Sequence, residues 1–198
     1  MNNQKEIINK IIRDRESVFP GGFDPEKKIE DKVIREILEN AVWAPTHGLT
    51  QPWFFKVFYR KGIHTFFNKL KEIYKIITPT EKFSETKYNK YDLKSSQVSH
   101  VIAVYMRKDP KGKIPEIEEI VATGCAIENI YLSLKAYGIA GYLSTGNIAY
   151  TREIHNFLGL SENERVIGFF QLGVPAAGVK EKQRKRTPAS EKTTWISE

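Results

Sequence analysis

A short loop between two prolines carries side chains that could do chemistry. Residues Ala44–Trp53 read Ala-Pro-Thr-His-Gly-Leu-Thr-Gln-Pro-Trp, and Pro45 and Pro52 disfavour helix at the residues before them. The segment is therefore predicted to be a stiff turn, and Gly48 allows its backbone to approach a ligand closely. Its polar side chains belong to Thr46, His47, Thr50 and Gln51. Stiff turns often carry binding groups, although an ordinary connection with an exposed histidine explains the pattern equally well.

A second candidate group lies near the N-terminus, where Arg15 and Ser17 are separated by one residue. A guanidinium offers a forked pair of charge-assisted donors and a hydroxyl adds one more, so the two side chains suit an anion such as a phosphate. An exposed arginine beside a helix-ending serine is the simpler interpretation, and it is favoured while the pair is considered alone.

A basic tract lies near the C-terminus, in a chain whose net charge is +7. Its five cations fall within seven residues and are opposed only by Glu181; they are Lys180, Lys182, Arg184, Lys185 and Arg186. Such a tract suits nucleic acid, an anionic membrane, an anionic cofactor or simple solvation. Aromatic residues are not interleaved with these charges and no nucleic-acid-binding motif is present, which disfavours the first option.

Composition limits the kind of protein further. At 198 residues and 40% hydrophobic content, the chain is long enough for one domain with a real core. Its single cysteine, Cys125, excludes an intrachain disulfide and a cysteine-cluster metal site, and it is expected to be a small buried hydrophobe. No apolar run approaches the roughly 20 residues that span a bilayer, and the polar start lacks a signal core. We therefore expect a cytoplasmic setting, no membrane partner and no metal.

Hydrophobic periodicity predicts the elements that position these residues. Helices are expected near 4–14, from 31 to the turn at 43–45, and over 63–77, 116–137 and 151–158. Strands are expected over 54–60, 101–106, 140–145 and 166–172. Gly138 is a natural end for the long helix before it. Residues 80–97 have no clean periodicity, so they form either a helical flap over a cofactor edge or a solvated connector.

Four motifs together resemble the nitroreductase family, whose members are FMN-dependent reductases that oxidise NAD(P)H. They are Arg-x-Ser after the first helix, Ala-Pro-x5-Gln-Pro-Trp after the second, Gly173-Val-Pro175 after the last strand, and the Arg-x-Arg pair in the basic tract. They occur in the family's order, from Arg15 to about Pro188. The resemblance implies an α+β fold with a mainly antiparallel central sheet flanked by helices. It also implies one domain over residues 1–198, and a homodimer that shares two FMN sites and exchanges its C-terminal segments, which end in Trp195-Ile196.

The same resemblance assigns the cofactor-binding residues. The FMN phosphate would be held by Arg15, Ser17, Arg184 and Arg186. The ring and ribityl chain would be framed, partly across the subunit boundary, by Pro45, Thr46, His47, Thr50, Leu143, Ser144, Thr145 and Gly146. A lysine near the pyrimidine edge would stabilise charge on reduced flavin, and the candidates are Lys87, Lys90 and Lys94.

Three residues depart from the family pattern. Glu16 and Phe19 stand where basic residues are usual, and Leu49 stands where many members have asparagine. The ribityl contact of that asparagine passes to Thr50 or is absent. His47 could donate a proton to a substrate, since histidine side chains commonly act as proton donors near neutral pH. We favour a hydrogen bond to the flavin or to the loop, because hydride transfer from a flavin needs no protein acid.

The resemblance implies an oxidoreductase that passes hydride from NAD(P)H through FMN to a nitroaromatic, a quinone or a similar small acceptor. A flavin-binding or flavin-sequestering protein with little turnover is the alternative, which the departures at Glu16 and Leu49 keep open. A basic nucleic-acid-binding domain is a distant third hypothesis, and it predicts salt-sensitive binding without cofactor.

Overall fold

The structure is a computed structural model that describes residues 2–179 and 185–197. Its helices are α1 (Asn2–Asp14), α2 (Asp31–Ala41), α3 (Lys61–Ile77), α4 (Glu85–Gln97), α5 (Glu116–Ala136) and α6 (Arg152–Phe157). Its strands are β1 (Trp53–Tyr59), β2 (His100–Arg107), β3 (Ala140–Ser144) and β4 (Glu164–Gly173). Every one of these elements except α4 agrees with a sequence prediction to within a few residues, and the region 80–97, left open by the sequence, contains α4.

The four strands form one sheet in the order β1-β2-β4-β3, and each neighbouring pair is antiparallel. β2 and β4 lie in the middle and are almost wholly buried, which explains their nearly continuous apolar sequence. β3 is a short edge strand. The α+β class with an antiparallel sheet is therefore confirmed.

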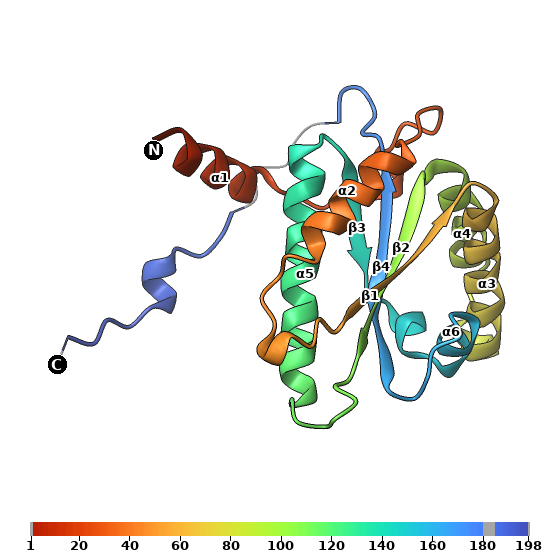
Figure 1. Ribbon diagram of the computed structural model, residues 1–198. Coiled ribbons are helices and arrows are strands. Elements are labelled where there is room, and N and C mark those ends of the chain that lie inside the picture. The colour runs from red at the N-terminus through yellow and green to blue at the C-terminus, as the bar shows by residue number, and fades with distance from the viewer. Residues whose placement is uncertain (1, 180–184, 198) are drawn as a thin grey trace.

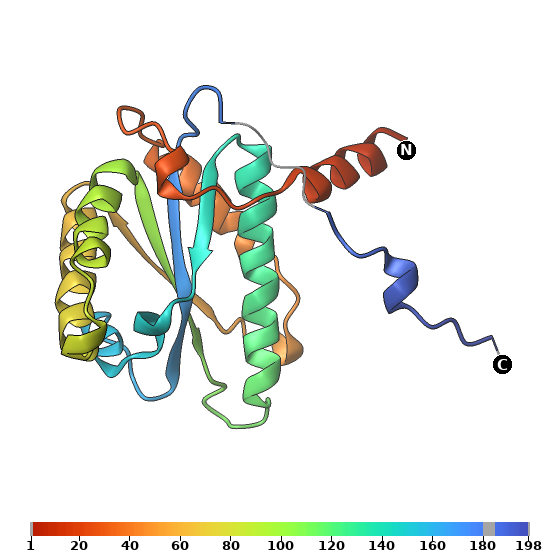
Figure 2. The same cartoon turned by 180° about the vertical axis from the view of Figure 1, so that it is seen from behind.

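Helices cover both faces of the sheet (Figure 1, Figure 2): α2 and α5 on one, and α3, α4 and α6 on the other. Each face has its own buried cluster. Phe169 packs with Phe66 towards α3, while its neighbour Phe170 packs with Ile130 towards α5. Successive residues of a strand point to opposite faces, so β4 supplies both cores. Each fully buried side chain of this size stabilises the fold by about 1.5–3 kcal/mol.

The two ends of the chain project from this body on the α5 side (Figure 1). Ile7 and Ile8 of α1 are about half exposed, and Trp195 and Ile196 of the tail are 91% and 85% exposed. Their apolar side chains thus face outward. Within residues 2–179 and 185–197, no helix is both long and apolar enough to cross a lipid bilayer.

The end of α5 follows the glycine signal in the sequence. Gly138 has φ +67°, and its N–H donates to the carbonyl of Lys135, while the N–H of Ile139 donates to Leu134. These bonds close the helix in the arrangement typical of a glycine at this position, and they direct the chain into β3.

A close contact where β4 ends provides a test of this packing. A Cβ built on Gly173 would lie 2.4 Å from the ring of Phe23, which is 3% exposed and opposite Pro175. We predict that Gly173→Ala lowers the free energy of unfolding by about 1–3 kcal/mol, because the buried ring must move. Gly21→Ala is the control, since nothing lies within 4 Å of its Cβ position. Equal urea midpoints for both variants would contradict the packing described.

Candidate functional site

The loop between α2 and β1 has an unusual backbone. It contains a 3₁₀ turn over His47–Leu49, and Gly48, Leu49 and Gln51 have φ of +58°, +54° and +48°. For residues other than glycine this left-handed region costs about 1–2 kcal/mol, so surrounding contacts must hold Leu49 and Gln51 in it. Such outliers concentrate at ligand sites.

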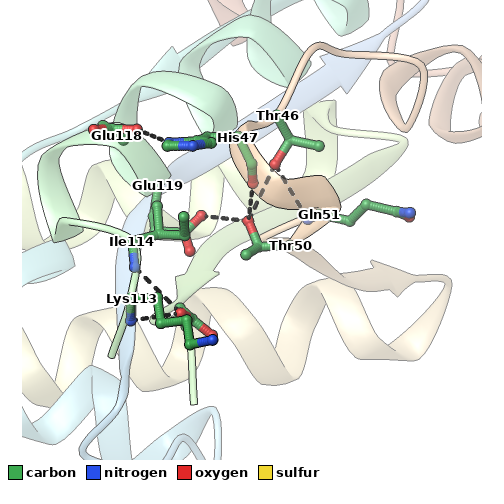
Figure 3. Close-up of polar contacts among 9 residues, drawn as sticks. Thr46, His47, Thr50, Gln51, Lys113, Ile114, Glu118 and Glu119 are labelled. Atoms are coloured by element: carbon green, nitrogen blue, oxygen red, sulfur yellow. Dashed lines mark hydrogen bonds and ion pairs between the residues drawn. The ribbon is translucent and has the colours of Figure 1, made fainter. Parts of the chain in front are cut away.

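Two side-chain contacts hold this loop against the first turn of α5 (Figure 3). His47 Nδ1 meets Glu118 Oε2, and the hydroxyl of Thr50 donates to Glu119 Oε2 at 2.8 Å. Thr46 Oγ1 accepts from the N–H of Gln51 at 3.2 Å and lies 3.1 Å from the Thr50 hydroxyl. The polar residues found in the sequence thus fix the loop itself, which supports the structural role for His47.

Glu119 is the buried member of this cluster. It is 1% exposed, and its Oε1 has no hydrogen-bond partner among the described residues. Acidic residues in the first turn of a helix are favoured by the helix dipole, which is the signal that the sequence offered for Glu118 and Glu119. Their role as anchors for a loop 69 to 71 residues earlier could not be read from that signal.

The Arg15–Ser17 segment lies beside β3. The N–H of Val18 donates to the carbonyl of Gly141 at 3.0 Å, and the Arg15 guanidinium lies 4.9 Å from the ring centre of Tyr131. A cavity of about 320 Å³ opens here, which we call the arginine cavity. Its lining includes Arg15, Glu16, Tyr131, Lys135, Gly141 and Pro175.

A second cavity, of about 520 Å³, lies among α3, α4 and the ends of β3 and β4, and we call it the lysine cavity. Its lining includes Lys82, Lys87, Lys94, Ser144, Gly146 and Gln171, and no carboxylate belongs to it. Tyr91 also lines it, and burial raises the pKa of this phenol to about 12, so its hydroxyl stays protonated at neutral pH. The cavity therefore presents donors and positive charge.

Phe19 and Tyr142 connect the N-terminal segment to the lysine cavity. The ring of Phe19 lies on that of Tyr142, with centroids 4.6 Å apart. The Tyr142 hydroxyl accepts from Lys94 Nζ at 3.3 Å. Phe19 occupies the position at which the nitroreductase resemblance predicts a basic residue. Through Tyr142, Lys94 lies near that position. Of the three candidate lysines, Lys87 and Lys94 line the cavity and Lys90 does not.

The other predicted site residues fall into separate groups. Leu143 packs with the α5-side core, and Thr145 is exposed. Arg186 lies on the projecting tail, where its guanidinium donates to the carbonyl of Lys185, and Arg184 lies outside the described residues. Pro45, Thr46, His47 and Thr50 line neither the arginine cavity nor the lysine cavity. Among the described residues, the lysine cavity therefore brings together Lys87, Lys94, Ser144 and Gly146, while Arg15 lies in the separate arginine cavity.

Another cavity lies away from these groups. It measures about 880 Å³, at the start of α2 and α3, and none of the predicted site residues lines it. His100 is buried there between the Ser99 hydroxyl and Asp31. Burial lowers the pKa of His100, although Asp31 opposes the shift. Since the Ser99 hydroxyl also accepts from the N–H of Ile29 at 2.8 Å, this network ties the chain before α2 to β2.

Comparison with known proteins gives the family. Residues 12–174 match the model of the nitroreductase family. The chain belongs to the nitroreductase family. The family that the sequence motifs resemble is thereby confirmed, and the match covers the loop, the lysine cavity and the part of the arginine cavity that precedes Pro175.

Three proteins similar to this nitroreductase-family chain match it along nearly its whole length. YfhC of Bacillus subtilis, whose name provisionally describes an NAD(P)H nitroreductase, is 28% identical and covers 97% of this chain and 95% of its own. A nitroreductase-like family protein from Bacillus cereus has a TM-score of 0.80 at 25% identity, over 96% of each chain. The FMN-dependent nitroreductase NfnB of Mycobacterium smegmatis, solved in complex with NADPH, has a TM-score of 0.75 at 17% identity. The match covers 98% of this chain and 100% of NfnB. At this identity the likeness shows the fold alone.

The hydroxyl that anchors the loop can be tested directly. We predict that Thr50→Val lowers the free energy of unfolding by about 1–3 kcal/mol, because it leaves the buried Glu119 carboxylate without that donor. Thr50→Ser keeps the hydroxyl and is the matched control. If urea unfolding gave Val and Ser variants of equal stability, the Thr50–Glu119 bond would not anchor the loop.

Proposed function

We propose that this nitroreductase-family chain is an FMN-dependent oxidoreductase that passes hydride from NAD(P)H to a small acceptor such as a nitroaromatic or a quinone. The observation that carries the proposal is the lysine cavity, which joins Ser144 and Gly146 of the family's ring-binding segment to three lysines and no carboxylate. The family match over residues 12–174 supports the same activity. The single-domain organisation and the cytoplasmic setting remain predictions.

The residues present fit FMN chemically. Arg15 and Ser17 offer charge-assisted donors to a phosphate at one end of β3. At the other end, Lys94 offers a cation to an electron-rich ring, and Gln171 offers a buried amide oxygen for which the described residues supply no hydrogen-bond partner. β3 contributes Gly141 to the arginine cavity and Ser144 to the lysine cavity, so an extended ligand that runs along this strand would reach both.

The bound flavin would supply the hydride-accepting and hydride-donating ring. The protein itself would position the flavin and supply positive charge to it. Arg15 and Ser17 would hold the phosphate, while Lys94, oriented by the Tyr142 hydroxyl, would supply positive charge to stabilise the reduced ring. Lys94 thereby takes the place of the base that is missing at Phe19.

A second copy of the chain completes this proposal. The loop Ala44–Trp53 lines neither cavity, so the ring would be framed from one side only within a single chain. The exposed apolar surface of α1 and of the tail supports a homodimer in which the C-terminal segments are exchanged. This exchange would carry Arg184 and Arg186 to the partner's phosphate. Sedimentation of the full chain as a monomer at micromolar concentration would contradict the shared site.

A flavin-holding protein with little turnover is the second candidate. Glu16 lines the arginine cavity beside Arg15, where its negative charge opposes a phosphate. Leu49 is 79% exposed in the loop and offers no polar group to a ribityl chain. Both features weaken the ordinary FMN site without removing the lysine cavity.

One absorption experiment separates these functions. Purified protein is incubated with FMN, desalted and titrated anaerobically with NADH or NADPH. We expect retained flavin bands that bleach with at least one nucleotide. Retained bands that bleach with neither would favour the flavin-holding protein, and loss of all flavin on desalting would contradict both functions.

The phosphate site predicts a specific loss of affinity. Arg15→Ala and Arg186→Ala should each weaken FMN binding by about 1.5–3 kcal/mol, because each removes charge-assisted hydrogen bonds. Arg13→Ala is the matched control, since it removes the same charge from the exposed end of α1. Fluorescence titration of FMN measures the effect. A double variant that combines Arg15→Ala with Arg186→Ala is measured as well. If it bound FMN with the same dissociation constant as Arg13→Ala, neither Arg15 nor Arg186 would belong to the phosphate site.

A further inference from the structure

Gln171 is a buried polar residue that the fold does not use. It lies on β4, is 2% exposed, and is flanked in the sheet by Val101 of β2 and Tyr142 of β3. Its Oε1 is buried and has no hydrogen-bond partner among the described residues. A buried acceptor without a partner destabilises a fold, and an apolar side chain of similar size would avoid that cost.

The position of this amide indicates what it serves. Gln171 lines the lysine cavity with Lys94, Ser144 and Gly146. In the register of β3 and β4 it stands opposite Tyr142, whose hydroxyl is already engaged by Lys94. Paired residues share a face of the sheet, so the amide and the Tyr142–Lys94 pair lie on the same side.

We propose that the amide of Gln171 recognises the imide edge of the flavin, with Oε1 accepting a hydrogen bond from the ring N3–H. This proposal rests on the proposed function and names a residue that recognises the cofactor by a hydrogen bond. The imide edge alternates carbonyl oxygen, N–H and carbonyl oxygen. Lysine side chains only donate, so Lys94 suits a carbonyl oxygen and cannot pair with the N–H between them. The buried Oε1 supplies that acceptor.

The proposal makes apo stability and cofactor affinity change in opposite directions. Gln171→Leu removes the buried amide oxygen that has no partner in the described part of the chain, so the apo protein should be at least as stable as the wild type in thermal unfolding. The same variant should bind FMN roughly tenfold more weakly, which is the effect of one lost hydrogen bond. Gln97→Leu is the control, because this half-buried glutamine at the end of α4 lies outside the lysine cavity.

An analogue isolates the hydrogen bond from packing. N3-methyl-FMN has no N3–H, so its affinity should be the same for the wild type and for Gln171→Leu, while the affinity for FMN differs between them. Gln171→Met, which keeps the length of the side chain and lacks the amide, is measured beside it in case the leucine distorts β4. Both affinities come from fluorescence titration and need no turnover.

The outcomes separate this proposal from the function on which it rests. A wild type that binds FMN and oxidises NAD(P)H, with Leu and Met variants of unchanged FMN affinity, would overturn the role of Gln171 and leave the oxidoreductase intact. Equal weakening for FMN and for N3-methyl-FMN would also overturn it, because the amide would then act through packing. A wild type that binds no FMN would overturn both.

Discussion

The pairing of the edge strand β3 with β4 positions the residues that the sheet supplies to the lysine cavity. Their register sets Tyr142 opposite Gln171 and Ser144 opposite Phe169. A slip of one residue would turn these side chains to the α5 face, because the faces of a strand alternate. Two glycines make the pairing close: a Cβ on Gly141 would lie 2.6 Å from Leu172, and one on Gly168 would lie 3.0 Å from Leu143. The site therefore depends on an exact register between two short runs of sequence.

The same geometry leaves two electrostatic features that the chain does not balance by itself. The lysine cavity collects cations without a carboxylate in its lining, and Gln171 buries an acceptor beside them. The buried acceptor lowers the stability of the isolated fold, and a ligand that donates a hydrogen bond to this amide and accepts hydrogen bonds from the lysines would match both features. Residues that a fold tolerates at a cost are best explained by what they bind, and a flavin ring combines the two properties.

Sequence patterns predicted the elements and the family, because periodicity and turn residues act locally. Long-range placement was not available from them. Lys87 and Lys94 line the cavity because they are seven residues apart, two helical turns, yet α4 has no apolar stripe from which that face could be chosen. Gln171 interrupts the apolar run 166–172, which was the signal for a buried polar role, but its face depends on the register with β3. The order of the motifs along the sequence also does not predict where they lie in space. It therefore gave no indication that Ala44–Trp53 lies apart from the lysine cavity within one chain.

That separation is the strongest physical argument for a second copy. On α5, Ile117 and Val121 are 65% and 59% exposed, and Gly124 follows at helical spacing with open space at its Cβ position. Near them Leu49 is 79% exposed in a strained loop that is held on the same helix. A stripe of apolar and small residues allows close packing of another helix. If a partner's α5 packed there, one association would cover this apolar surface and bring the partner's loop towards the cavities. Leu49, which cannot replace the asparagine of related chains, would then serve the interface rather than the ribityl chain.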